Sequence, residues 1–460
     1  MKFIYAGFEK IKNLVFNPIF LGMISIVFLW ILQPNIGIRS VDAYAYIVGS
    51  FSIHDGKGYV SLGGELLNHW PPGYSFILSL FSSPIFAAQI INYLSFGLSI
   101  GLIYFLARKN NWACSSALGF SLAIGFGFFR SLVNNVMPDI LTYAVFLLAC
   151  AIFFEKLTVP RVWSYLFWAV LIPLKLIAVV FIPAAIFTRI WITGISCVRR
   201  QRGEFLIASL LWSFFLGSIL VFNYISLGVL IPASHGGPDI HSILQELKSF
   251  ASSIPRFFLS HWYGTIKNLN YFLLFSIELL IGVVCLLTLK LKDKKFFVFS
   301  IILIFFFLLL QCVREYGGAV RLTGYGLLIL ILSFVPRERY SKLWLLYGGF
   351  TLVLATINSL TSNAMGINDP HYKQLAALFS EINFKKEKIY TNSFHVLDVH
   401  QKIYSEFTDT PSKLKQGDLF FWVTLPNYDA GNSSVVTVDI SNVSWQELDT
   451  FEGGKLLRKK

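Results

Sequence analysis

Apolar runs of about 20 residues recur along most of this 460-residue chain, and they restrict its possible folds more than any other feature. A run of that length is what an α-helix needs to cross the hydrocarbon core of a bilayer. The composition agrees, because 55% of the residues are hydrophobic and only 14% are charged, whereas soluble proteins average about 25% charged. The sequence therefore predicts an all-α polytopic membrane protein.

The apolar runs predict about 11 transmembrane helices within residues 1–361. One segment, 163–191, is too long for a single upright helix at a rise of 1.5 Å per residue, and it holds Pro173 and Lys175 in its middle. We interpret it as two short helices that turn near Lys175. The other spans are expected at about 14–33, 84–107, 114–129, 138–156, 205–225, 271–290, 296–313, 320–335 and 342–361.

Basic residues are unevenly distributed along the chain. Residues 1–361 hold 27 Lys and Arg against 13 Asp and Glu, while residues 362–460 hold 11 against 12. If the N-terminus is cytoplasmic, 18 of the 27 fall on the cytoplasmic side and 9 in the outer loops, which is the asymmetry of a multi-pass protein in an inner or plasma membrane. No basic patch is interleaved with exposed aromatics, so we do not expect nucleic acid as a partner.

The C-terminal part has a different pattern. Within residues 362–460, the stretches 388–399 and 417–425 are typical of strands, and 372–382 is typical of an amphipathic helix. We therefore divide the chain into a transmembrane module, 1–361, with a long outer loop at 34–83, and a small extracytoplasmic α/β domain, 362–460. The five cysteines lie in or beside apolar runs without metal-ligand spacing, which indicates small core residues.

Ionisable residues gather on the predicted outer side. Such groups beside apolar helices are usually paired, water-exposed or functional. A carboxylate can take a proton from an acceptor hydroxyl or amine, and fixed cations can neutralise a phosphate leaving group. The residues concerned are Asp42, Asp139, Lys175, Arg314 and Arg321.

Each of these residues also has a structural interpretation. Asp42 could cap a helix or pair with Arg39, and Asp139 lies where a helix dipole favours an acid. Lys175 could extend its ammonium to the membrane surface. Arg314 and Arg321 could pair with Glu315.

The order of these residues resembles the glycosyltransferase C superfamily, in particular the protein O-mannosyltransferases and lipid A aminoarabinose transferases. An Asp with a Tyr four residues later, Asp42 and Tyr46, follows the first span, and Pro71-Pro72-Gly73-Tyr74 ends the first outer loop. The acidic start "MPDILTYAVFLLA" opens the fourth span. A cation in a helical hairpin and a late Arg that opens a span complete the pattern, which covers roughly residues 1–340.

This resemblance implies an inverting transferase that uses a polyprenyl-phosphate sugar donor at an outward-facing site. It implies Asp42 as the general base and Asp139 as the second acid. Trp70 stands where the aminoarabinose transferases have Lys, so phosphate binding is assigned to Lys175, Arg321 and Arg314 instead. Residues assigned to the acceptor or sugar are Tyr46, Glu65, His69 and Tyr74.

The cofactor and partners follow from the same resemblance. The first loop lacks the D-x-D pattern with which some superfamily members hold a divalent metal, so we expect a metal-independent reaction. The expected partners are the polyprenyl-phosphate sugar, membrane lipids, and a lipid, glycan or protein acceptor.

Two other functions fit a chain of this class. A transporter or flippase of lipid-linked glycans should show inverted repeats with broken helices in matching positions, and the sequence shows no such halves. A polysaccharide polymerase or ligase would use a diphosphate-linked donor and favour paired Arg in a long outer loop, whereas the loop 226–270 holds only Arg256.

Overall fold

The computed structural model describes residues 17–33, 41–61, 66–67, 71–133, 135–227, 248, 251, 254, 269–313, 319–361, 389–391, 405–407, 410–423, 440–451 and 454–460. The chain divides into two compact units. The first, the helical unit, consists of residues 1–32, 90–133 and 138–362. The second consists of 33–89, 134–137 and 363–460. The division that we predicted, at residue 361, stays a prediction.

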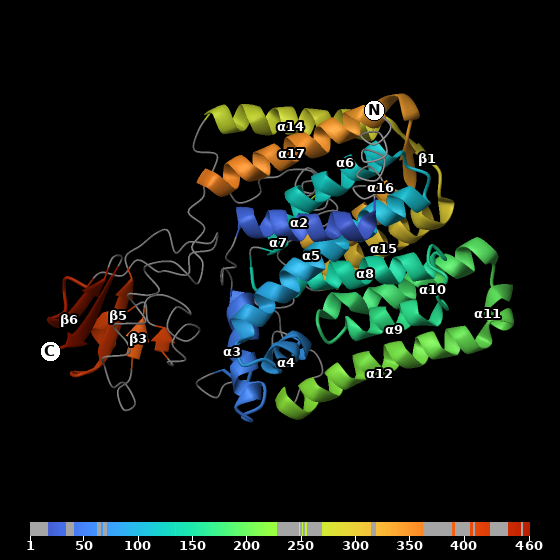
Figure 1. Ribbon diagram of the computed structural model, residues 1–460. Helices are drawn as coiled ribbons and strands as arrows, with labels where there is room; N and C mark the ends of the chain where they lie inside the picture. The colour runs from blue at the N-terminus through green and yellow to red at the C-terminus, as the bar shows by residue number, and fades with distance from the viewer. Residues whose placement is uncertain are drawn as a thin grey trace. The chain divides into compact units, whose positions relative to one another are not determined.

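Apolar helices form the helical unit (Figure 1). Five helical stretches in the described residues are long and apolar enough to cross a membrane: 84–109, 114–133, 176–193, 202–225 and 338–357. The predicted polytopic helical class is thus confirmed, while the number of 11 spans stays a prediction. The long helices are α2 (Pro18–Leu32), α5 (Pro84–Lys109), α6 (Cys114–Ile124), α8 (Asp139–Phe153), α10 (Phe181–Thr193), α12 (Arg202–Leu227), α14 (Leu269–Leu287), α15 (Lys294–Val313), α16 (Ala319–Leu332) and α17 (Ser341–Thr361).

The predicted break near Lys175 is confirmed. Helix α9 (Val162–Val170) ends in a turn over residues 171–174, and the 3₁₀-helix η2 (Leu176–Val180) then leads into α10. Lys175 itself is extended, with φ −154° and ψ 110°. Pro173 lacks the N–H that a continuous helix would need, so the chain reverses here and α9 and α10 form a hairpin with Lys175 at its tip.

A π-helical turn interrupts the segment predicted as the third span. Helix α6 runs into the π-helix η1 (Gly125–Phe129) and then the short helix α7 (Arg130–Val133). Single π-turns inside α-helices occur frequently at functional sites. The extra residue per turn brings Phe128 and Phe129 against Tyr143 of α8, with ring centroids 5.5 and 5.0 Å apart.

Polar contacts lie at two opposite ends of the helical unit. At the end that carries most basic residues, Glu204 of α12 accepts hydrogen bonds from Tyr165 and Arg189 and so joins α12 to both arms of the hairpin. The strands β1 (Leu289–Leu291) and β2 (Phe334–Pro336) pair there, and Lys156 forms an ion pair with Asp293 at 3.2 Å. We call this the basic end. The start of α8 and the hairpin tip lie at the other end, the Asp139 end.

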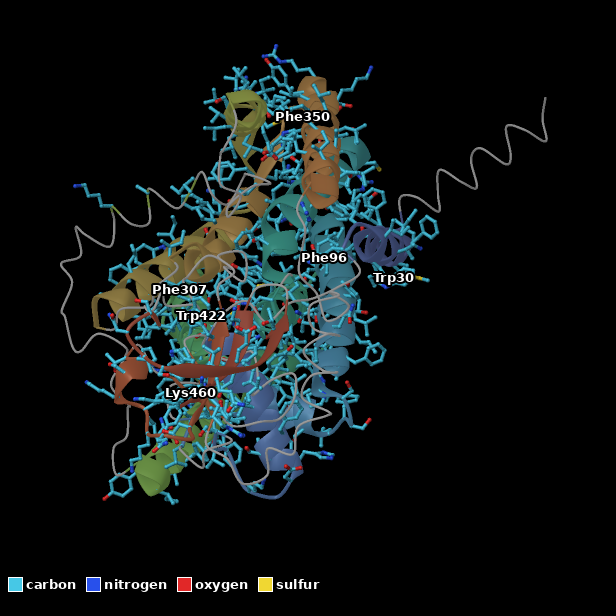
Figure 2. The ribbon with its side chains drawn as sticks, turned by 90° about the vertical axis from the view of Figure 1, so that its left-hand side faces the viewer. Trp30, Phe96, Phe307, Phe350, Trp422 and Lys460 are labelled. Carbon is cyan, nitrogen blue, oxygen red and sulfur yellow. The ribbon has the colours of Figure 1, made fainter. Side chains whose placement is uncertain are left out.

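An aromatic core fills the space between α8, α9, α10, α15 and α16. Phe146 lies 4.8 Å from Phe181 and 5.1 Å from Tyr325, and Trp168 stacks on Phe299 at 5.8 Å, measured between ring centroids. The unit exposes apolar side chains, as a lipid-facing surface requires. Leu206, Leu210 and Phe214 of α12 are 60%, 59% and 68% exposed. In Figure 2, Trp30 is on such a surface of α2, whereas Phe96 is buried.

Two structured parts make up the described second unit. Helices α3 (Val41–His54) and α4 (Gly73–Ser79) pack together in the region predicted as the outer loop. The C-terminal part forms a five-stranded sheet, in which Phe420 and Leu457 form the core with Leu414. A small sheet region in the C-terminal part is confirmed, whereas the α/β domain with the bounds 362–460 stays a prediction; the predicted helix 372–382 lies outside the described residues. The strands, in spatial order, are β4 (Ser405–Phe407), β3 (Ile389–Thr391), β5 (Leu419–Val423), β7 (Gly454–Lys459) and β6 (Trp445–Phe451).

Candidate active site

An ion pair between Asp139 and Lys175 is the centre of the candidate site. The Lys175 ammonium donates to Oδ1 of Asp139, and the two side chains are 16% and 1% exposed. The residues are 36 positions apart in the sequence and come from different elements, the start of α8 and the tip of the hairpin. A buried charge pair of this kind carries a large desolvation penalty, so its presence in an apolar bundle marks this end as a functional candidate.

Local sequence explains how each partner is positioned. Pro138 precedes α8 and suits a helix start, because it has no N–H to leave without a partner. Asp139 follows in the first turn, where the positive end of the helix dipole favours its charge. Lys175 is held by its backbone N–H, which donates to the Leu171 carbonyl at 2.8 Å, while its own carbonyl accepts from Ala178 at 2.9 Å.

A chain of hydrogen bonds fixes α16 to the start of α8. The Thr142 hydroxyl donates to the Asp139 carbonyl at 2.7 Å and lies 2.5 Å from the Tyr325 hydroxyl. A hydroxyl has a single proton, so Thr142 accepts the proton of Tyr325. Arg321 precedes Tyr325 by four residues, so its backbone lies about one turn nearer to the start of α16.

Stacked aromatic rings also join α8 to α16. Tyr143 and Tyr325 stack with ring centroids 3.8 Å apart and planes at 7°. Gly324 permits the contact, since an added Cβ would collide with the Tyr143 hydroxyl and lie 3.1 Å from the Phe128 ring. Arg130 directly follows the π-turn that packs on Tyr143, and it is a buried cation, 5% exposed. Asp139, at the start of α8, therefore lies about one helical turn from this layer of packed aromatic rings.

Asp42, the predicted base, lies in the first turn of α3 and is half-buried. Tyr46 of α3 and Tyr74 of α4 are both buried, and their rings meet edge to face with centroids 5.4 Å apart. Ser75 donates to the Tyr46 carbonyl at 2.9 Å. Burial raises the pKa of the Tyr59 hydroxyl above its ordinary value, and a hydrogen bond with Ser75 opposes that shift.

Several predicted site residues cannot be placed. Glu65, His69 and Arg314 lie outside the described residues, and of Arg321 only the backbone is described. Among the described residues, no three His, Cys, Asp or Glu side chains converge as a metal-binding group. The predicted roles of these residues and the metal-independent reaction stay predictions.

Together with Arg130, which the sequence places with Asp139 on the predicted outer side, the structure adds three residues that we did not predict: Thr142, Tyr143 and Tyr325. Arg130 carried a sequence signal, because it is a charge within an apolar run. The other three carry none in the sequence. A threonine and two tyrosines in apolar helices are ordinary, and only the pairing of α8 with α16 brings them together.

Comparison with known proteins supports the fold alone. No protein-family model and no curated protein matches the sequence. The crystal structure of ArnT from Cupriavidus metallidurans bound to undecaprenyl phosphate is similar, with a TM-score of 0.51 and 11% identity over 95% of this chain and 96% of that chain. The apo structure of ArnT gives 0.50 and 12% over 98% of both chains. The chain therefore has a fold similar to that of ArnT.

Proposed function

We propose that this chain, which has the fold of ArnT, is an integral membrane glycosyltransferase. It transfers a sugar from a polyprenyl-phosphate-linked donor to a lipid, glycan or protein acceptor at the extracytoplasmic face of the inner or plasma membrane. The observation that carries the proposal is the likeness to ArnT over almost the whole of both chains, since it includes the helical unit as well as the C-terminal part. The ArnT structure that binds undecaprenyl phosphate supports a lipid phosphate as the donor's carrier.

The roles of the residues follow from the chemistry of inverting transfer. Asp42 takes the proton from the acceptor hydroxyl or amine while the acceptor attacks the anomeric carbon. The bond from that carbon to the phosphate oxygen breaks, and its electron pair leaves with polyprenyl phosphate. Lys175, Arg321 and Arg314 offset the growing negative charge of the phosphate. Asp139 assists by orienting the acceptor or the base.

The acceptor and sugar are assigned to the α3–α4 region. Tyr46 and Tyr74 shape this region through their ring contact, and Glu65 and His69 provide polar groups in the intervening segment. A transporter of lipid-linked glycans, or a polysaccharide polymerase or ligase, is the alternative. A transporter would bind a lipid-linked glycan without releasing its sugar, so turnover separates the two classes.

The test is donor turnover by the purified protein. A panel of polyprenyl-phosphate sugars is offered with candidate acceptors, and mass spectrometry follows the release of polyprenyl phosphate. We expect release by the wild type and a decrease of at least about 100-fold in Asp42→Asn, since a general base typically contributes 10²–10⁴-fold.

The matched control is Asp55→Asn. Asp55 directly follows α3, its side chain is 42% exposed, and it pairs with Lys57. This substitution should leave turnover unchanged. Binding of a lipid-linked glycan without release from any donor, unaffected by Asp42→Asn, would favour the transporter and contradict the proposal.

A further inference from the structure

The Lys175 ammonium is already balanced by a carboxylate. Asp139 accepts its hydrogen bond, and the side chain of Asp139 is 1% exposed. The dipole of α8 favours the same negative charge. A phosphate that binds Lys175 must therefore share the ammonium with Asp139 or displace it. Two anions that share one ammonium lie within about 6 Å of each other, a separation at which like charges repel strongly.

Donor and product differ in charge at this position. The phosphate of a polyprenyl-phosphate sugar is a diester and carries one negative charge. Transfer converts it into a monoester, because the breaking bond leaves its electron pair on the phosphate oxygen. A phosphate monoester carries about −1.5 to −2 charge at pH 7. The repulsion by Asp139 is consequently greater after the reaction than before it.

We propose that Asp139 is a specificity-determining residue, which competes with lipid phosphate for Lys175 and so favours the donor diester over the product monoester. The inference rests on the proposed function and adds a role for Asp139 in product release. The carboxylate weakens phosphate binding overall, and it weakens monoester binding more. When the product leaves, Asp139 pairs with Lys175 again.

The test measures binding and needs no turnover. Undecaprenyl phosphate, its methyl phosphodiester and undecaprenol are titrated into the purified protein in nanodiscs, and Kd is determined by native mass spectrometry. In Asp139→Asn we expect undecaprenyl phosphate to bind about tenfold tighter than in the wild type, and the diester about threefold tighter. A tenfold change corresponds to about 1.4 kcal/mol, which is close to the lower limit of what one hydrogen bond to a charged group contributes.

The ion pair at the basic end supplies a matched control. Asp293 pairs with Lys156 at 3.2 Å, and both side chains are about as buried as Lys175, at 18% and 19% exposed. Asp293→Asn removes the same charge from a similar pair at the opposite end of the helical unit, so it should leave all three Kd values unchanged. A gain of the same size in this variant would indicate a general effect of net charge and would overturn the inference.

A second variant ties the effect to Lys175. Lys175→Met alone removes the partner of a buried carboxylate and can prevent folding, so it is combined with Asp139→Asn, which leaves a neutral pair. In the double variant the gain in phosphate binding should disappear. If it persists, or if both phosphate probes gain equally in Asp139→Asn, the inference is wrong.

The outcomes separate this inference from the proposed function. A folded wild type that binds undecaprenol as well as undecaprenyl phosphate would contradict the proposed function. Phosphate-dependent binding that is unchanged or weaker in Asp139→Asn would contradict only the inference, because Asp139 would then not compete with the phosphate for Lys175.

Discussion

At the scale of single residues, the bond between Tyr325 and Thr142 offers a test of how the Asp139 end is held together. Tyr325→Phe removes the donated proton but keeps the ring that stacks on Tyr143, so we expect a loss of about 1 kcal/mol in stability. Thr142→Val should cost more, about 2 kcal/mol, because it takes the acceptor away from a hydroxyl on a fully buried residue. The measurement is the melting temperature in detergent.

The double variant Thr142→Val/Tyr325→Phe decides whether the two hydroxyls act together. If they do, its melting temperature should lie near that of Tyr325→Phe rather than at the sum of the two losses. Tyr224→Phe on α12 is the control, since that ring is 59% exposed on an apolar helix face, and it should have no effect. Additive losses would contradict a direct bond between the pair.

The sequence predicted the residue types of the candidate site but not their contacts. Asp139 and Lys175 stood out because they are charges beside apolar runs. Their pairing depends on how the α9–α10 hairpin packs against α8, which hydropathy does not encode. Thr142 and Tyr325 are 183 positions apart, and neither differs in kind from other residues of its helix.

At the scale of elements, the crossing of α6 and α17 depends on two glycines that let the backbones touch. A Cβ added to Gly348 would lie 2.7 Å from the Cα of Gly119, which no rotamer change can relieve because the obstacle is backbone. We expect Gly348→Ala to lower stability by roughly 2 kcal/mol, as overpacking typically does, visible as a lower melting temperature.

The adjacent glycine of the same helix is a close control. A Cβ added to Gly349 meets nothing within 4 Å, so Gly349→Ala should keep or slightly raise the melting temperature, because Ala favours a helix by about 1 kcal/mol over Gly. Equal losses in the two variants would mean that α17 is sensitive to any added methyl group rather than to its contact with α6.

Elements that follow from length and hydropathy were predictable from the sequence, and those that depend on partners were not. The span expected at 84–107 is α5, Pro84–Lys109, and the break at Lys175 followed from an overlong apolar run with a proline. The π-turn at Gly125–Phe129 and the pairing of β1 with β2 were not predicted. A π-turn has no periodicity of its own, and three-residue strands carry too little pattern to recognise.

At the scale of the whole molecule, the number and direction of the spans determine the side on which each loop lies. Among the described residues, three long helices, α15, α16 and α17, separate Lys292 from Gln416 of the C-terminal part. If all three cross the bilayer, the two residues lie on opposite sides. The basic residues near Lys292 predict that it is cytoplasmic and that Gln416 is extracytoplasmic. Sidedness cannot be inferred from contacts among helices, because these are the same in either orientation.

Single cysteines at these two exposed positions test both statements. We expect a membrane-impermeant maleimide to label Gln416→Cys in right-side-out vesicles and Lys292→Cys only in inverted ones. The unmodified protein gives the background labelling of its own cysteines, of which Cys150, Cys197 and Cys285 are buried and Cys114 is partly exposed. Labelling of both variants in the same vesicles would mean that one of the three helices does not cross. The reverse pattern would place the C-terminal domain in the cytoplasm, on the side opposite to the donor site that we propose.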